Sequence, residues 1–246
     1  MRTYFLTELR HQMVSPYQIM FSILMPIFML NIFGHSSGSE RMLSTGANVS
    51  AIMLIQIAFY SAVLASTMSG SLVARDREAQ WTRTMYLAGV SDYKLILCRF
   101  GWGVCASAIS TTLLYIIAAS TGAVMPVRWW LITWFTIIAI STLFSGFGQF
   151  AGSIFSDHNA GGIASGIIVL LAFVSDIFIP LQHTMFTVAQ FMPLFGFKSA
   201  LTGVLMDGHS AAMQELNATF VWINVSVWSV VLIGLSYIAV RLSRRR

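Results

Sequence analysis

Charge is scarce in this sequence. Lysine, arginine, aspartate and glutamate make up 9% of the 246 residues, whereas hydrophobic residues make up 57%. A soluble domain has about 25% charged residues, so this chain has too few charges to cover a surface that faces water. Disorder is excluded as well, because disordered chains have low hydrophobicity. The class that remains is a polytopic membrane protein.

Lysine and cysteine are also rare, and their shortage excludes further classes. The two lysines follow Tyr93 and Phe197, so neither belongs to the Gly-Lys-Ser/Thr end of a nucleotide-binding loop. Cys98 and Cys105 lie in one apolar run, which favours packed free thiols over a disulfide framework. The five histidines form no i, i+4 pair that would hold a metal. We therefore expect no ATPase motif, no catalytic set and no metal site in this chain.

Six apolar stretches are long enough to cross a bilayer, which requires about 20 residues of helix. They cover residues 17–34, 49–73, 95–120, 129–150, 161–179 and 218–240. Residues 1–16 precede the first stretch and place Phe5, Leu6 and Leu9 on one helical face. This segment predicts a short helix in the membrane interface, and an ordered tail packed on the bundle is the alternative.

The basic residues predict the orientation of these spans. If both termini are cytoplasmic, 11 of the 14 basic residues lie inside, and Arg41, Arg128 and Lys198 lie outside. The positive-inside rule thus favours six spans in the cell membrane with cytoplasmic N and C termini. The basic segment 241–246 is then a topological anchor near anionic lipid, and we expect no nucleic-acid partner.

The densest group of charges follows the second apolar stretch. Eight of the 23 charged residues lie between Arg75 and Arg99. Residues 89–92, Gly-Val-Ser-Asp, predict a turn and an N-cap before the third span. We expect an amphipathic helix within 75–92 that docks a cytoplasmic partner, with a simple solvated loop as the alternative. The candidate docking residues are Arg75, Asp76, Arg77, Glu78, Trp81 and Arg83.

The segment 177–208 is apolar but interrupted by Pro180 and Pro193. Each half is too short to cross a bilayer, and short helices at membrane depth are tolerated where they pack on protein. The pattern predicts a re-entrant hairpin of two short helices that enters from outside. A single extra span is the alternative. Asp176, which precedes this segment, is the only acid well inside an apolar run, so we expect it to face an interior or to be solvated at the outer interface.

Small residues four positions apart predict close contacts between helices. Gly148 and Gly152 form one such pair, and Gly162 and Gly166 form another. These contacts would lie within the chain or at a cavity between two chains.

The order of these features resembles that of ABC-2-type transporter permeases along nearly the whole chain. Residues 75–78 and 89–91 are similar to the family's Arg-Glu-Arg-Glu run and its later Val-Ser turn. Residues 178–181 and 192–194 are similar to the family's Phe-Pro-Leu and Leu-Pro pair. The sequence departs from the family at 80–83, where Gln-Trp-Thr-Arg replaces the frequent Gly-Thr-Leu-Glu.

The resemblance implies an all-α polytopic fold and the membrane subunit of a two-component ABC exporter. Two permease chains, identical or different, would form the pore, and two separate ATPase subunits would bind ATP and Mg and receive segment 75–92. The expected cargo is a small amphiphilic drug, a peptide antibiotic or a lipid, which suggests a role in multidrug or antibiotic resistance. Apolar and aromatic side chains of the second and fifth spans are candidates for the substrate path, although such groups also serve packing. Together with the nearby acid they are Met53, Phe59, Tyr60, Phe173, Asp176 and Phe178.

Other functions stay open at this point. A polysaccharide or glycolipid exporter of the same family is the nearest alternative. A secondary transporter is disfavoured because the spans have almost no ionisable residues and show no inverted repeat. A membrane enzyme or assembly factor is disfavoured because the apolar runs contain no paired acids or nucleophile–base set.

Overall fold

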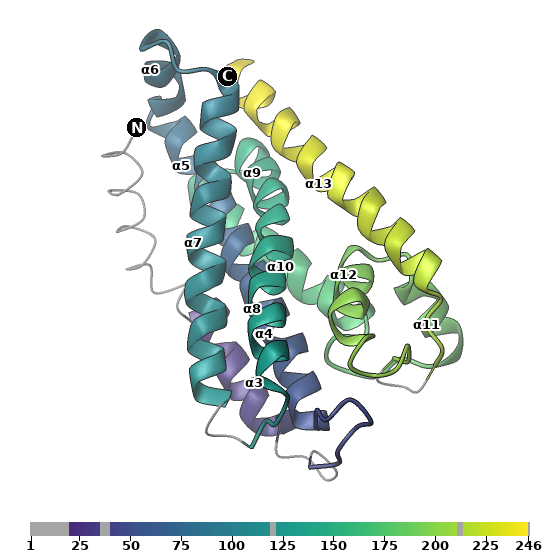
Figure 1. Ribbon diagram of the computed structural model, residues 1–246. Coiled ribbons are helices and arrows are strands. Elements are labelled where there is room, and N and C mark those ends of the chain that lie inside the picture. The colour runs from purple at the N-terminus through teal and green to yellow at the C-terminus, as the bar shows by residue number, and fades with distance from the viewer. Residues whose placement is uncertain (1–19, 35–39, 119–121, 211–213, 246) are drawn as a thin grey trace.

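The computed structural model describes residues 20–34, 40–118, 122–210 and 214–245, in which every regular element is a helix (Figure 1). The predicted interfacial helix over residues 1–16 lies outside this part of the chain. The elements in chain order are η1 (Met20–Leu24), α3 (Met25–Gly34), α4 (Val49–Ser71), α5 (Val73–Glu78), α6 (Trp81–Leu87), α7 (Asp92–Ala118), α8 (Val127–Leu143), α9 (Ser145–Ile154), α10 (Asp157–Val174), α11 (His183–Ala189), α12 (Pro193–Thr202) and α13 (Ala218–Arg245).

Within the described residues, four helical segments are long and apolar enough to cross a membrane. They are Val49–Glu78, Tyr93–Ala118, Val127–Ile154 and Ala218–Leu242. The first and fifth predicted stretches form shorter apolar helices, Ser22–Ile32 and Asn159–Val174. The helical class expected from the sequence is confirmed, and the four long apolar helices suggest a membrane-embedded protein. The number of six spans stays a prediction.

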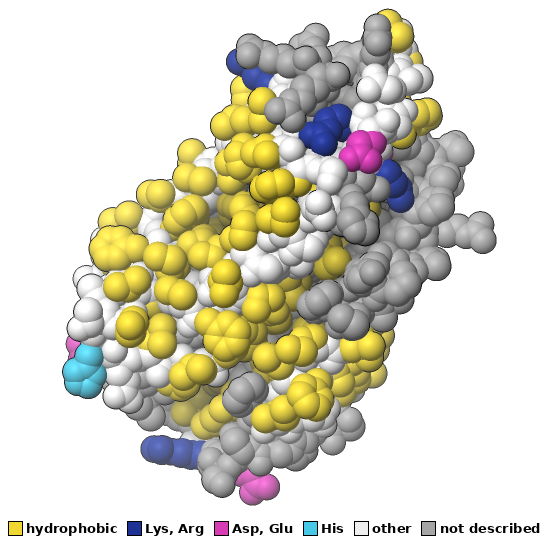
Figure 2. Space-filling view, turned by 180° about the vertical axis from the view of Figure 1, so that it is seen from behind, with side chains coloured by type: hydrophobic (Ala, Val, Ile, Leu, Met, Phe, Trp, Pro, Cys, Tyr) yellow, Lys and Arg dark blue, Asp and Glu magenta, His cyan; other side chains and the backbone are white. Residues whose placement is uncertain are grey.

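The outer surface of the helices is apolar between the two ends of the molecule. Figure 2 shows hydrophobic side chains over the middle of one face, and the charged side chains described on that face lie toward its ends. Exposed hydrophobic residues occur on most of the long helices, as expected of surfaces that meet lipid. Examples are Phe28, Ile32, Leu97, Ile116, Leu131, Phe135, Leu170, Trp222 and Val230.

Helix α4 forms the centre of the bundle. It contacts α3, α7, α8, α9, α10 and α12, and 89% of its most apolar window is buried, compared with 28% for α13. A helix that is apolar on all sides has no preferred face in its sequence. Its central position therefore follows from packing and not from periodicity.

Glycines bring α9 against α4. A Cβ atom added to Gly148 would lie 1.9 Å from the carbonyl oxygen of Thr67, and one added to Gly152 would lie 2.5 Å from that of Ser71. This pair therefore makes the predicted contact within the chain. By contrast, a Cβ atom added to Gly162 or Gly166 on α10 would meet nothing within 4 Å, so this second pair makes no such contact with the described residues.

The proline-broken segment forms two short helices, as its sequence predicts. Helices α11 and α12 have 7 and 10 residues, about 10 and 15 Å of helix, so neither crosses a bilayer. The alternative of one extra span is therefore wrong. Pro193 occupies the first turn of α12, where a missing N–H costs nothing, and Pro180 lies in the irregular segment before α11.

Helix α13 holds this pair of helices in place. The side-chain Nδ2 of Asn224 donates to the carbonyl of Gln190 at 2.7 Å, and the indole N–H of Trp228 donates to that of Phe191 at 3.0 Å. A Cβ atom on Gly196 would lie 2.3 Å from Asn224 Oδ1, so α12 approaches α13 closely. The hairpin is thus fastened to the last helix at its turn.

Candidate functional site

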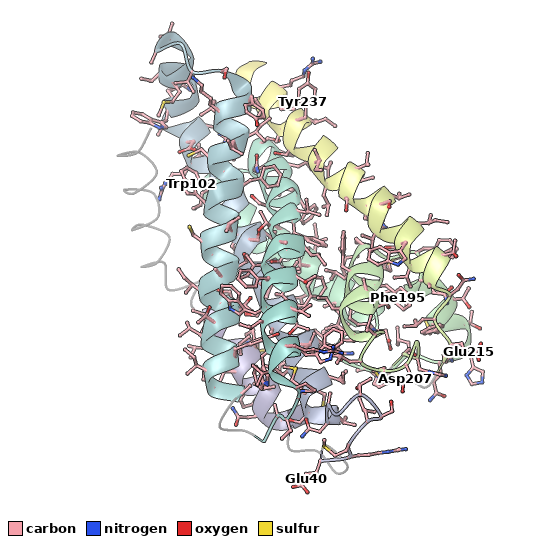
Figure 3. All side chains as sticks on the ribbon, in the orientation of Figure 1. Glu40, Trp102, Phe195, Asp207, Glu215 and Tyr237 are labelled. Carbon is pink, nitrogen blue, oxygen red and sulfur yellow. The ribbon has the colours of Figure 1, made fainter. Side chains whose placement is uncertain are left out.

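The two candidate sites lie at opposite ends of the bundle. Helices α5 and α6 and the end of α13 lie at one end, and the α11–α12 pair lies toward the other (Figure 1). Figure 3 places Glu40, Asp207 and Glu215 at the end opposite α6, whereas Tyr237 lies toward the α6 end. The charged segment and the hairpin segment are therefore separated by the length of the long helices.

The segment 75–92, in which we expect an amphipathic helix, contains the end of α5 and all of α6. The run 75–78 belongs to α5, which follows α4 with only Leu72 between them. The chain then breaks at Gln80, whose φ of +56° is unfavourable for a residue with a side chain. A separate seven-residue helix, α6, follows. The predicted turn before α7 is present, with Gly89 at φ +76°.

Among the candidate docking residues, Asp76 and Arg77 contact neighbouring helices. The Asp76 carboxylate faces the Arg99 guanidinium on α7, with 3.8 Å between Oδ2 and a guanidinium nitrogen, and both side chains are buried. The Arg77 guanidinium donates to the carbonyls of Ser153 and Phe155, the latter at 2.7 Å. These carbonyls end α9, where a cation satisfies acceptors that lack helical partners. Both residues therefore fasten α5 to neighbouring helices.

The remaining candidates offer more surface. Glu78 is exposed, and 38% of the surface area of Trp81 is accessible to solvent. Leu87, at the end of α6, is 84% exposed. Arg75 is half-buried, and the side chain of Arg83 lies outside the described residues. Glu78 is the last residue of α5, and Trp81 is the first residue of α6.

At the other end, Asp176 forms a buried ion pair. Its φ is +61°, and its side chain is fully buried. Lys198 Nζ on α12 donates to Asp176 Oδ2 at 2.5 Å and to its carbonyl oxygen at 3.0 Å. Asp176 Oδ1 accepts the backbone N–H of Leu181 at 2.6 Å. Asp176 is therefore bonded to protein groups. This agrees with the predicted interior position and not with solvation at the outer interface.

A pocket of about 150 Å³ lies beside this ion pair. It is bounded by the loop before α4, the first two turns of α4, the segment after α10 and the turn after α12. Its walls are mostly apolar. The lining residues are Arg41, Leu43, Val49, Ile52, Met53, Gln56, Ile57, Asp176, Ile177, Phe178, Pro180 and Met206.

The structure brings most of the candidate path residues together. Met53, Asp176 and Phe178 line the pocket. The Tyr60 and Phe178 rings meet edge to face with centroids 4.7 Å apart, and the Phe173 and Phe178 rings are 5.0 Å apart. Phe59 lies in the core with its ring 6.4 Å from that of Phe144.

Sequence reasoning missed several polar side chains at this end. Gln56 is 5% exposed, lines the pocket, and its Nε2 atom has no hydrogen-bond partner. Asn48 caps α4 by accepting from Ala51 at 2.9 Å, and its Nδ2 donates to Gly122 at 2.8 Å. A glutamine inside an apolar run was a usable signal, because an intramembrane polar group is costly. The role of Asn48 depends on a contact with residue 122, which no local pattern indicates.

These observations define a class, a helical protein with apolar helices of membrane-crossing length, a charged segment at one end and a pocket beside a buried ion pair at the other. No protein-family model matches the chain, and no curated protein matches it.

Proposed function

We propose that this chain is the membrane subunit of an ATP-driven ABC exporter of the ABC-2 type, which moves an amphiphilic drug, peptide antibiotic or lipid out of the cell. The resemblance in the order of sequence features supports this proposal. In it, η1–α3 and α10 are the first and fifth of six spans, the chain lies in the cell membrane, and both termini are cytoplasmic. A second permease chain, identical or different, completes the pore.

The main structural support is the continuity between the two candidate sites. The segment Val49–Glu78 begins at the pocket and ends with the charged residues of α5. Its 30 residues correspond to about 45 Å of helix. Because the segment is packed on several sides, a displacement of α5 would be transmitted to the pocket as movement of a rigid body.

In the proposed mechanism, ATP and Mg bind to separate ATPase subunits, and the exposed surface of α5–α6 docks against them. ATP binding changes the relative stability of two arrangements of the permease, and hydrolysis resets them. Within this surface, Glu78 and Trp81 are the contact groups, whereas Asp76 and Arg77 keep α5 attached to α7 and α9.

Co-purification tests the proposal. The tagged chain is expressed in its native membrane, extracted in mild detergent and analysed for a bound ATPase subunit and for ATP hydrolysis. The double variant Glu78→Lys/Trp81→Ala should lose the partner and the hydrolysis it supports. Glu40→Lys is the matched control, because this exposed acid lies at the opposite end of the molecule.

Size-exclusion chromatography in detergent verifies that both variants insert and fold. Recovery of the chain without any ATPase subunit from native membranes would overturn the proposed class. Unchanged partner binding by the double variant, with the ATPase present, would overturn only the docking surface.

A further inference from the structure

A short hairpin precedes α4 and forms part of the pocket wall. The N–H of Val49 donates to the carbonyl of Arg41 at 3.1 Å, and the N–H of Gly46 donates to that of Leu43 at 3.0 Å. Gly46 has a φ of +79°, a conformation that glycine adopts readily in tight turns. We call residues 41–46 the flap. Because these bonds lie within the hairpin and at its base, the flap keeps its shape when its tip moves.

The flap lies between the pocket and the solvent. Arg41 and Leu43 line the pocket, and Met42 between them is 55% exposed. The pocket is also lined by Met206, which belongs to the turn after α12. The flap and this turn come from distant parts of the sequence, so the wall that they form together depends on the contact between them.

Two side-chain hydrogen bonds join the flap to this turn. The hydroxyl of Ser44 donates to the carboxylate of Asp207, and the hydroxyl of Thr45 donates to the carbonyl of Leu205 at 2.8 Å. The two acceptors lie on either side of Met206 in the sequence, and Met206 itself lines the pocket. The tip of the flap is therefore fastened at the point where the turn forms the pocket wall.

These two bonds are easier to break than the contacts that fix another side of the pocket. The bond made by Ser44 is exposed, and the bond made by Thr45 is partly buried. Local opening costs least where hydrogen bonds are accessible to solvent, because water can replace the lost partner. The ion pair between Asp176 and Lys198 is buried, and separating two buried charges is costly. The pocket should therefore open at the flap.

We propose that the flap is a gate that closes the pocket and opens when Ser44 and Thr45 release the turn after α12. In the open state, water bonds to the released groups and the pocket exchanges solutes with its surroundings. This takes place at the end of the molecule where Figure 3 shows Asp207, opposite α6. The gate consists of this chain alone and needs neither ATP nor a partner subunit, so it can fail while the exporter proposal stands, and the reverse also holds.

Chemical labelling of a cysteine in the pocket measures the opening. The native Cys98 and Cys105, which are half-buried, are first replaced with alanine in the full chain to give the parent. Ile52→Cys then places one thiol in the pocket wall, at a position that is 3% exposed. A charged methanethiosulfonate reagent is added to the purified chain in mild detergent. It reaches this thiol in the open state, so the labelling rate follows the open population.

Removal of the two hydroxyls should favour the open state. Ser44→Ala/Thr45→Val should speed labelling of the Ile52→Cys thiol about tenfold, because two net hydrogen bonds of accessible groups are lost. Each single substitution should speed it about threefold, so the test does not depend on the folding of the double variant. The exchange Ser44→Thr/Thr45→Ser keeps both hydroxyls and should leave the rate near that of the parent.

Two controls separate opening of the gate from general loosening of the chain. Thr136→Val/Ser226→Ala removes the same two kinds of hydroxyl from exposed bonds within α8 and α13, and labelling of the Ile52→Cys thiol should not change. Leu54→Cys places a thiol at a buried position of α4 that does not line the pocket. This thiol should stay unlabelled with and without the flap substitutions.

Three results would overturn the proposal. An unchanged labelling rate in the double flap variant shows that the two bonds do not hold a gate. Equal acceleration at Leu54→Cys shows that the whole chain loosens. Labelling of Ile52→Cys in the parent as fast as that of Leu87→Cys, a position that is 84% exposed, shows that the pocket is open without any release of the flap.

Discussion

The buried ion pair between Asp176 and Lys198 yields the sharpest prediction about stability. Both side chains are almost fully buried, at 0% and 2% exposure, and they join the end of α10 to α12. Lys198→Met keeps a side chain of similar length but removes the cation. The Asp176 carboxylate would then stay buried without its cation. Of the two groups that donate hydrogen bonds to its oxygens, Lys198 Nζ would be lost and the N–H of Leu181 would remain.

The expected loss follows from the cost of an unpaired buried charge. Removing one partner of a buried ion pair typically destabilises a protein by about 3–5 kcal/mol. For a chain of this size, each kcal/mol corresponds to about 2–4 °C in Tm. Lys198→Met should therefore lower the Tm by about 6–20 °C, as measured by tryptophan fluorescence during heating in detergent.

A second substitution separates the charge from the shape of the site. Asp176→Asn in the Lys198→Met background removes the buried charge and keeps an acceptor for the Leu181 N–H. Asparagine also tolerates the positive φ at this position. The double variant should recover most of the lost stability. If Lys198→Met lowers the Tm by less than 2 °C, or if the double variant is no more stable than either single one, the argument from charge burial is refuted.

Three further outcomes are expected. Gly148→Ala should lower the Tm because its Cβ atom would overlap the Thr67 carbonyl, whereas Gly162→Ala should leave it equal or higher because the added atom meets open space; equal effects would contradict the assigned helix contact. Arg77→Met should destabilise the chain by about 1.5–3 kcal/mol through loss of its bonds to the end of α9, and faster limited proteolysis of that end would reveal it. Asn224→Leu should speed hydrogen exchange at the turn between α11 and α12, which its Nδ2 atom anchors; unchanged exchange would contradict that anchoring role.

The hairpin segment could be predicted well because its signals are local. Two prolines divide an apolar run into halves that are too short to span a bilayer, and the structure forms α11 and α12 there. Pro193 begins a helix for the same local reason, its fixed φ and absent N–H. Length and backbone restriction are readable from consecutive residues, so no knowledge of distant contacts was needed.

The charged segment was only partly predictable. The turn at Gly89 and a helix within 75–92 are present, but the division of the segment into α5 and α6 was not predicted. The helix breaks at Gln80, where the sequence has no glycine or proline that would predict a break. The hydrogen bonds of Arg77 reach carbonyl groups 76 and 78 positions away in the sequence, and no local pattern indicates such distant partners.

Composition and run length alone determined the class of this protein. A chain with 9% charged and 57% hydrophobic residues must bury or place in lipid most of its surface, and a helix satisfies its own backbone in that environment. Tertiary structure decided which apolar helix is central, which glycines touch a neighbour, and which polar groups are paired. Asp176 meets Lys198, whereas Gln56 stays without an acceptor for its Nε2 atom. The physical reason is that hydropathy is a property of consecutive residues, whereas pairing depends on the packing of helices that are distant in the sequence.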